Sequence, residues 1–111
     1  MSYEVARKEG HLAQILDRVR RIFVSEDYAM DVQDKVVYVD ASGGAITITL
    51  PSVAEAGGLI FVVRAVDTDS GNNTVTVEDK GDDAGLADVA LATDGAAAVM
   101  FSDGAKWYKL N

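Results

Sequence analysis

Apolar residues recur at helical spacing in the first part of the chain. Between residues 12 and 23 they follow one another at intervals of three and four, at Leu12, Ile15, Leu16, Val19, Ile22 and Phe23. This spacing places them along one stripe of an α-helix. The pattern therefore predicts an amphipathic helix as the main element of an N-terminal segment, residues 1–34.

After this segment the pattern changes to the shorter period of β-strands. In residues 45–50, for example, Ile46 and Ile48 alternate with threonines, whereas residues 35–40 and 59–66 are largely apolar on both faces. The expected strands are residues 35–40, 45–50, 59–66, 74–78, 87–93, 96–102 and 105–110. Residues 35–111 are therefore predicted to form an all-β body, a small sandwich or jelly-roll-like arrangement of about seven short strands.

Two Asp-Gly pairs divide the last part of the chain. Asp94-Gly95 and Asp103-Gly104 each lie between apolar runs, and Asp-Gly is a strong signal for the tight turn of a β-hairpin. The sequence thus predicts that the last three strands form an antiparallel meander.

Trp107 and Tyr108 are adjacent on the last expected strand, so they point to opposite faces. Trp107, the only tryptophan, is expected to anchor this strand in the core. The alternative is that one or both aromatic residues lie on the surface and form a binding platform.

Charge is distributed unevenly. Residues 1–24 hold five basic and three acidic residues, a net charge of +2, while residues 25–111 hold five basic and fifteen acidic residues, a net charge of −10. An acidic body repels nucleic acid and anionic membranes, so neither is expected as a partner. No stretch has the length and apolarity of a membrane span or a signal peptide.

Three roles are open for the N-terminal helix. It could lie on its own domain, or it could dock on another protein or on copies of itself. An arm that binds nucleic acid is disfavoured, because the basic residues alternate with acidic ones and lack interleaved aromatics. If the helix attaches the protein to a partner, the contact residues are the six apolar residues of the stripe together with Arg18 and Arg21.

Residues that commonly carry catalysis are scarce. His11 is the only histidine and the chain has no cysteine, so a Cys–His pair is excluded and a Ser-His-Asp set would need His11 to reach the body. No spacing singles out a pair of carboxylates for acid–base chemistry. We therefore expect neither enzymatic activity nor a cofactor.

A polar loop, "DTDSGNN" at residues 67–73, begins like a calcium-binding loop, with Asp67 and Asp69 at alternate positions. Gly71 then stands where a third ligand is required, and Asn72 occupies the position of the usual glycine. A solvated turn is the favoured interpretation, and a weak calcium site is the alternative.

The order of segments resembles a β module of tailed-phage virion proteins. The matching residues are "ITITLPSVAEAGGLIFVVRAVDTDSGNNTVTVEDKGDD" followed by "VMFSDGAKWYKL". The features that match are a Thr-rich strand ending in Leu-Pro, a Val-rich strand, a "TVTV" strand and a terminal hairpin with "WY". The resemblance covers about residues 36–111 and leaves residues 1–34 unmatched.

This resemblance implies a structural protein without catalytic residues. Modules of this kind occur in head-decoration proteins and in fibres, usually as trimers. The expectation is a homotrimeric decoration protein, made in the host cytoplasm, that binds the major capsid protein or another virion protein on the capsid surface. Its length of 111 residues leaves little room for a fibre's attachment domain, shaft and tip. The alternative is a receptor- or carbohydrate-binding fibre module in which Trp107 or Tyr108 stacks on a ligand.

Overall fold

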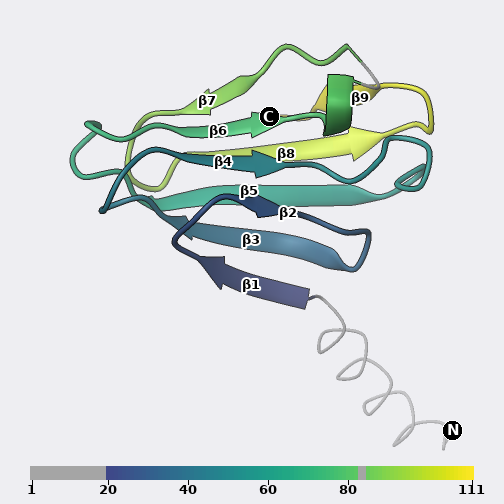
Figure 1. Ribbon diagram of the computed structural model, residues 1–111. Helices are drawn as coiled ribbons and strands as arrows, with labels where there is room; N and C mark the ends of the chain where they lie inside the picture. Colours follow the sequence, from purple (N-terminus) through teal and green to yellow (C-terminus); the bar gives the residue numbers. More distant parts are fainter. Residues whose placement is uncertain (1–19, 83–84) are drawn as a thin grey trace, which may run out of the picture.

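In a computed structural model, the chain forms two β-sheets that face each other across one hydrophobic core (Figure 1). The structure describes residues 20–82 and 85–111. The five-stranded sheet has the order β1 (Arg20–Val24), β3 (Asp34–Asp40), β5 (Ile60–Asp67), β8 (Ala97–Ser102) and β9 (Trp107–Lys109). The four-stranded sheet has the order β2 (Tyr28–Ala29), β4 (Ile46–Thr49), β6 (Val75–Glu78) and β7 (Val89–Leu91). A short 3₁₀ turn, η1, covers Lys80–Asp82.

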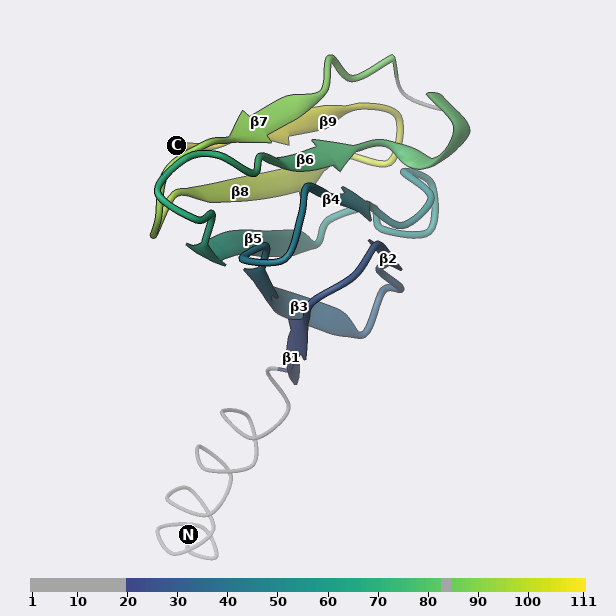
Figure 2. The same ribbon diagram turned by 60° about the vertical axis from the view of Figure 1, so that its left-hand side comes forward.

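The first six strands are wound as a flattened coil. Successive strands alternate between the two sheets, so β1, β3 and β5 lie side by side and parallel in one sheet, and β2, β4 and β6 do so in the other. Parallel neighbours need a crossover connection, and here the crossover is a strand of the opposite sheet. β7, β8 and β9 then pair antiparallel with their neighbours and complete the two sheets. Figure 2 shows β1 and β9 at opposite ends of the five-stranded sheet.

The core lies between the sheets and is formed by alternate residues of each strand. Inward side chains of β3 and β5 include Val37, Val39, Phe61 and Val63, all fully buried. The facing sheet contributes mainly β-branched side chains, namely Ile46, Ile48, Val75 and Val77. Burial of this continuous apolar layer is the main favourable contribution to folding.

The predicted all-β class is confirmed for the described residues, and each of the seven expected strands is present. The parallel winding differs from a jelly roll, whose strands pair antiparallel. No helix long and apolar enough to cross a membrane occurs in residues 20–82 and 85–111.

The predicted helix is wrong at its C-terminal end. Residues 20–24 form β1 and residues 28–29 form β2, and both strands belong to the sheets. The body therefore includes residues from Arg20 onward rather than from residue 35. Ile22 and Val24 pair in register with Val37 and Val39 of β3, and this partner supplies hydrogen bonds that outweigh a local helical preference. The expected helix over Leu12 to Val19 lies outside the described residues.

The two Asp-Gly pairs have different roles. Asp103-Gly104 closes the β8–β9 hairpin as predicted: Asp103 N donates to Lys106 O at 3.1 Å, and Gly104 has a φ of 95°. The predicted meander is wrong at Asp94-Gly95, because β7 pairs with β6 whereas β8 pairs with β5 and β9. This turn carries the chain from one sheet to the other.

Trp107 fixes the last strand to the core. Its side chain is only 5 % exposed and packs edge-on against Phe61, with ring centroids 5.7 Å apart. Among the described residues its indole nitrogen has no hydrogen-bond partner, so the anchor acts through packing. The expected core position of Trp107 is confirmed, and a surface platform at this residue is wrong.

Replacing Trp107 by Ala should lower the free energy of unfolding by about 3–5 kcal/mol, because it opens a cavity beside Phe61. Tyr108→Ala is the matched control, on the same strand but on the outer face, and should cost far less. Denaturant titration followed by circular dichroism measures both variants. Equal losses would contradict the role of Trp107 as the anchor of β9.

Candidate interaction surface

The outer face of the five-stranded sheet, hereafter the apolar face, carries mostly apolar side chains. It consists of the residues that alternate with the buried ones, and the strand register arranges them in rows. The first row is Arg21, Val36, Val62 and Val99. The second row is Phe23, Tyr38, Arg64 and Ala97, and a third contains Ile60, Phe101 and Tyr108.

All the large hydrophobic residues that are strongly exposed in the described part of the chain lie on this face. Their exposed fractions are 77 % for Phe23, 49 % for Ile60, 46 % for Val66, 45 % for Tyr108 and 54 % for Leu110. Leu110 belongs here because its N–H donates to Val99 O at 2.8 Å, which continues the β8–β9 pairing. Contiguous exposed apolar patches mark interaction sites, whereas single exposed apolar residues are ordinary.

The outer face of the four-stranded sheet is different in character. Its outward residues include Thr47, Thr49, Thr76 and Glu78, and the Thr49 hydroxyl donates to Glu78 Oε2 at 3.1 Å. A face of this composition is stable in water without a partner. Only one of the two outer faces is therefore unsuited to solvent.

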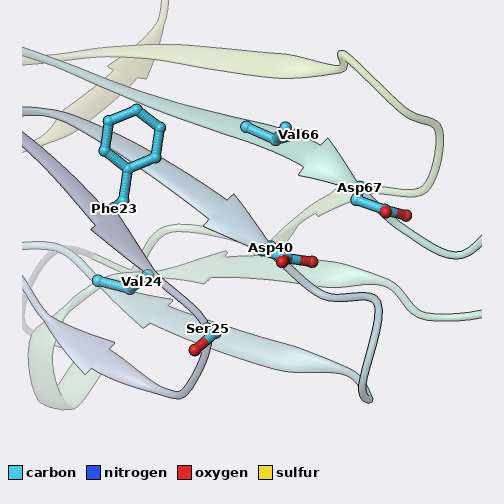
Figure 3. A pocket seen from close by; sticks show the side chains of 6 residues that line it. All are labelled: Phe23, Val24, Ser25, Asp40, Val66 and Asp67. Carbon is cyan, nitrogen blue, oxygen red and sulfur yellow. The ribbon is translucent and has the colours of Figure 1, made fainter.

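A hollow of about 360 Å³ lies at one end of the apolar face (Figure 3). Phe23 on β1 and Val66 on β5 flank it, and Asp40 and Asp67 lie at the ends of their strands. The Phe23 ring stacks on Tyr38, with centroids 4.7 Å apart and planes at 19°. The hollow combines apolar walls with carboxylates, which suits a side chain with an aliphatic stem and a basic head.

The carboxylate of Asp40 is held in its charged form by local hydrogen bonding. The backbone N–H of Ser42 donates to Asp40 Oδ1 at 3.0 Å and, together with the Ser42 hydroxyl, lowers the pKa of this carboxyl. The rim of the hollow thus keeps a negative charge down to acidic pH.

The predicted attachment residues do not remain on one stripe. Arg21 and Phe23 point outward on the apolar face, whereas Ile22 lies in register with Val37 and points to the opposite side. A strand alternates its side chains, so the helical grouping of Ile22 with Phe23 is wrong. The other predicted contact residues lie outside the described residues, and these are Leu12, Ile15, Leu16, Arg18 and Val19.

Of the two candidate surface aromatics, only Tyr108 is on the surface. Its hydroxyl donates to Asp103 Oδ2 at 3.1 Å, and its ring belongs to the apolar face beside Phe101. Sequence reasoning singled out neither this face nor its centre, Val62. The sequence analysis did note that residues 35–40 and 59–66 are apolar on both faces, but only the structure shows that their sheet has a single covering sheet.

The loop that resembles a calcium site is held by its own hydrogen bonds. Asp67 Oδ1 accepts the N–H of Asp69 at 2.8 Å, and Asn73 Nδ2 donates to Ala41 O at 2.7 Å. Within the described part of the chain, no three acidic or histidine side chains are grouped so that they could hold a metal ion. The loop is built as a turn that ties the end of β5 to the β3–β4 connection.

Asp94 ties the crossover turn to the same loop. Its Oδ1 accepts both the N–H and the hydroxyl of the buried Thr68, each at 2.7 Å. These two bonds lower the pKa of the Asp94 carboxyl. The Asp-Gly pair therefore contributes a cap between the two sheets instead of a hairpin.

Comparison of the chain with protein-family models, with curated proteins and with solved structures gave no match. The geometry nevertheless defines what this surface can do. A broad apolar face with two basic residues and a hollow at its end is suited to binding another protein surface.

The depressed pKa of Asp94 makes stability depend on pH. A carboxyl whose pKa is lower in the folded state stabilises the fold above its unfolded pKa, and that contribution is lost as the pH falls below roughly 4. Asp94→Asn keeps an acceptor oxygen but removes the charge. At pH 7 the variant should therefore melt at a lower temperature than the parent, and at pH 2–3 the two melting temperatures should be closer.

Asp69→Asn is the control, since it makes the same charge change in the adjacent loop, where its Oδ2 has only a 3.4 Å contact with Asn72. Thermal melts across pH 2–7 measure all three proteins. A constant difference between Asp94→Asn and the parent at every pH would contradict the role assigned to this charge.

Proposed function

We propose that the protein is a structural component of a bacteriophage particle, a homotrimeric head-decoration protein that attaches to the outer surface of the capsid through its N-terminal segment. The observation that carries this proposal is the concentration of exposed hydrophobic residues on one sheet face of a small, otherwise acidic body. The resemblance of residues 36–111 to tailed-phage virion modules supports the assignment of the protein to a phage particle.

Assembly is supported by the cost of leaving the apolar face in water. Each copy carries Phe23, Ile60, Val66, Tyr108 and Leu110 on one side. Copies of a particle component are held close together, so their apolar faces can cover one another. The decoration role, rather than a fibre, is supported by the single two-sheet body that the described residues form.

Attachment through the N-terminal segment is supported by the core that the described residues form among themselves. The buried cluster draws on residues from Met30 to Trp107, with Val24 packed against it. The apolar stripe over Leu12 to Val19 is proposed to contact the partner, and residues 1–24 carry a net charge of +2 against −10 for residues 25–111. The proposed partner is the major capsid protein or another virion protein.

A non-catalytic role is supported by how the carboxylates are used. Asp40, Asp94 and Asp103 all accept backbone N–H groups in turns, which is a structural use. The alternative function is a receptor- or carbohydrate-binding fibre module, for which exposed Tyr108 and Phe23 are the remaining aromatic platforms. Binding of the purified protein to a glycan array, lost in Tyr108→Ala, would favour that alternative.

The first test is the mass in solution. The chain has a mass of 11.8 kDa, so a trimer corresponds to about 35 kDa, three times that value. Light scattering after size exclusion should give this mass at micromolar concentration. A single-chain mass would rule out the trimer.

The second test concerns attachment. In the full chain, Ile15→Asp combined with Val19→Asp should abolish binding to phage particles stripped of the protein, because charge is placed in an apolar contact. The solution mass and the melting temperature should stay near those of the parent, since the described residues from Met30 to Trp107 already form a hydrophobic core. Co-sedimentation with stripped particles measures binding.

Arg18→Ala is the matched control for the attachment test, because Arg21 lies on the apolar face. Exposed charges at the edge of an interface change mainly the association rate and its salt dependence, so this variant should still sediment with particles at low salt. Undiminished binding of the Ile15 and Val19 variant would place the attachment surface on the β body instead.

A further inference from the structure

We propose that the apolar face is the surface through which copies of this chain contact one another, with Val62 near the centre of the contact. This inference rests on the assembly proposed above and adds to it the surface that is used. Val62 lies on β5, the middle strand of the five-stranded sheet, and is flanked in register by Val36 and Val99.

The composition of the face is that of a protein–protein contact. Interface cores are enriched in aromatic residues and Arg and depleted in Lys, Glu and Asp. The outward residues of β1, β3, β5, β8 and β9 include four aromatic rings, Phe23, Tyr38, Phe101 and Tyr108. Their charged members are Arg21, Arg64 and, at the strand ends beside the hollow, Asp40 and Asp67.

The distribution of charge favours a second copy as the occupant. Residues 25–111 hold fifteen acidic residues, so two bodies repel each other across most of their surfaces. On the apolar face the outward strand residues carry two acids, Asp40 and Asp67, which are balanced by Arg21 and Arg64. This face is therefore the side on which like copies can approach with the smallest repulsion.

The size of the face also fits a second copy. The five strands are three to eight residues long. At about 3.3 Å per residue and about 4.8 Å between strands they span roughly 460 Å² of sheet plane, and side-chain relief adds to the accessible surface. This is of the same order as the ~800 Å² that each partner contributes to a standard interface.

The chain's own N-terminal stripe is too small to cover the face. Were residues 12–19 helical, they would extend about 12 Å at 1.5 Å per residue, with four apolar side chains. They would cover a strip of the face and leave the rest in water. The apolar face of a second copy has the same extent as the face that has to be covered.

In a closed trimer every copy could bury this face, and no copy would be left with an unoccupied interface. The β1–β3 half of the face would contact one neighbour and the β8–β9 half the other, which brings β5 of each copy toward the threefold axis. Val62 residues of different copies then lie close together, and Thr76, on the outer face of the other sheet, does not.

The chain lacks cysteine, so single introduced cysteines report proximity between copies. In the full chain, Val62→Cys treated at micromolar concentration with a bismaleimide reagent that spans about 10 Å, the distance between packed sheets, should give covalently linked chains in high yield. Thr76→Cys is the matched control, an outward residue on an inner strand of the opposite sheet, and should stay unlinked.

Charge variants provide the second measurement. Val62→Glu should reduce the mass by light scattering to that of one or two chains at a concentration where the parent and Thr76→Glu keep the parent mass. Near-ultraviolet circular dichroism of Trp107 checks that the variants remain folded. If Val62→Glu does not fold, the cross-linking of Val62→Cys decides alone.

The inference is overturned if Val62→Cys does not link, whether the parent is an oligomer or a single chain, or if folded Val62→Glu keeps the mass of an oligomeric parent. It is also overturned if Val62→Cys links only when Ile15→Asp and Val19→Asp are present, because the N-terminal segment would then cover the face. Binding of the parent to stripped particles is scored separately, so failure of the virion role is distinguishable from failure of the contact surface.

Discussion

The parallel pairing of β3 with β5 is the interaction on which the rest of the structure depends. These strands place Val37, Val39, Phe61 and Val63 in the core and are joined in register along most of their length. β1 can form only because β3 presents an edge to it, and β8 adds to the other side of β5. Since parallel neighbours require a crossover, the same pairing forces β4 into the facing sheet and so creates the second layer.

The same pairing explains why one outer face is apolar. Parallel strands are usually buried on both sides and are rich in Val, Ile and Leu on both. β3 and β5 follow this composition, with Val36 and Val62 outward as well as Val37 and Val63 inward. The molecule supplies a covering sheet for one side only, which is why the other side is proposed to be covered by copies of the chain.

Turn chemistry then stabilises the winding at its ends. Asp94 caps buried Thr68, and buried Ser102 donates to Val53 O at 2.7 Å, which ties β8 to the connection after β4. Both contacts join residues far apart in sequence. Asp94, which was expected to form a hairpin turn, instead holds the connection between the sheets.

The sequence by itself determined where seven of the strands lie, that Trp107 is a core anchor and that Asp103-Gly104 closes a hairpin, because alternation and turn preferences are local properties of the chain. Only the tertiary structure decided that Ile22 and Phe23 belong to a strand, that Asp94-Gly95 crosses between sheets and that the apolar side chains of five strands form one face. Each of these depends on which distant strand is the neighbour. The residues around Ile22 are compatible both with a helical stripe and with a short strand. They form a strand because β3 offers them backbone hydrogen bonds.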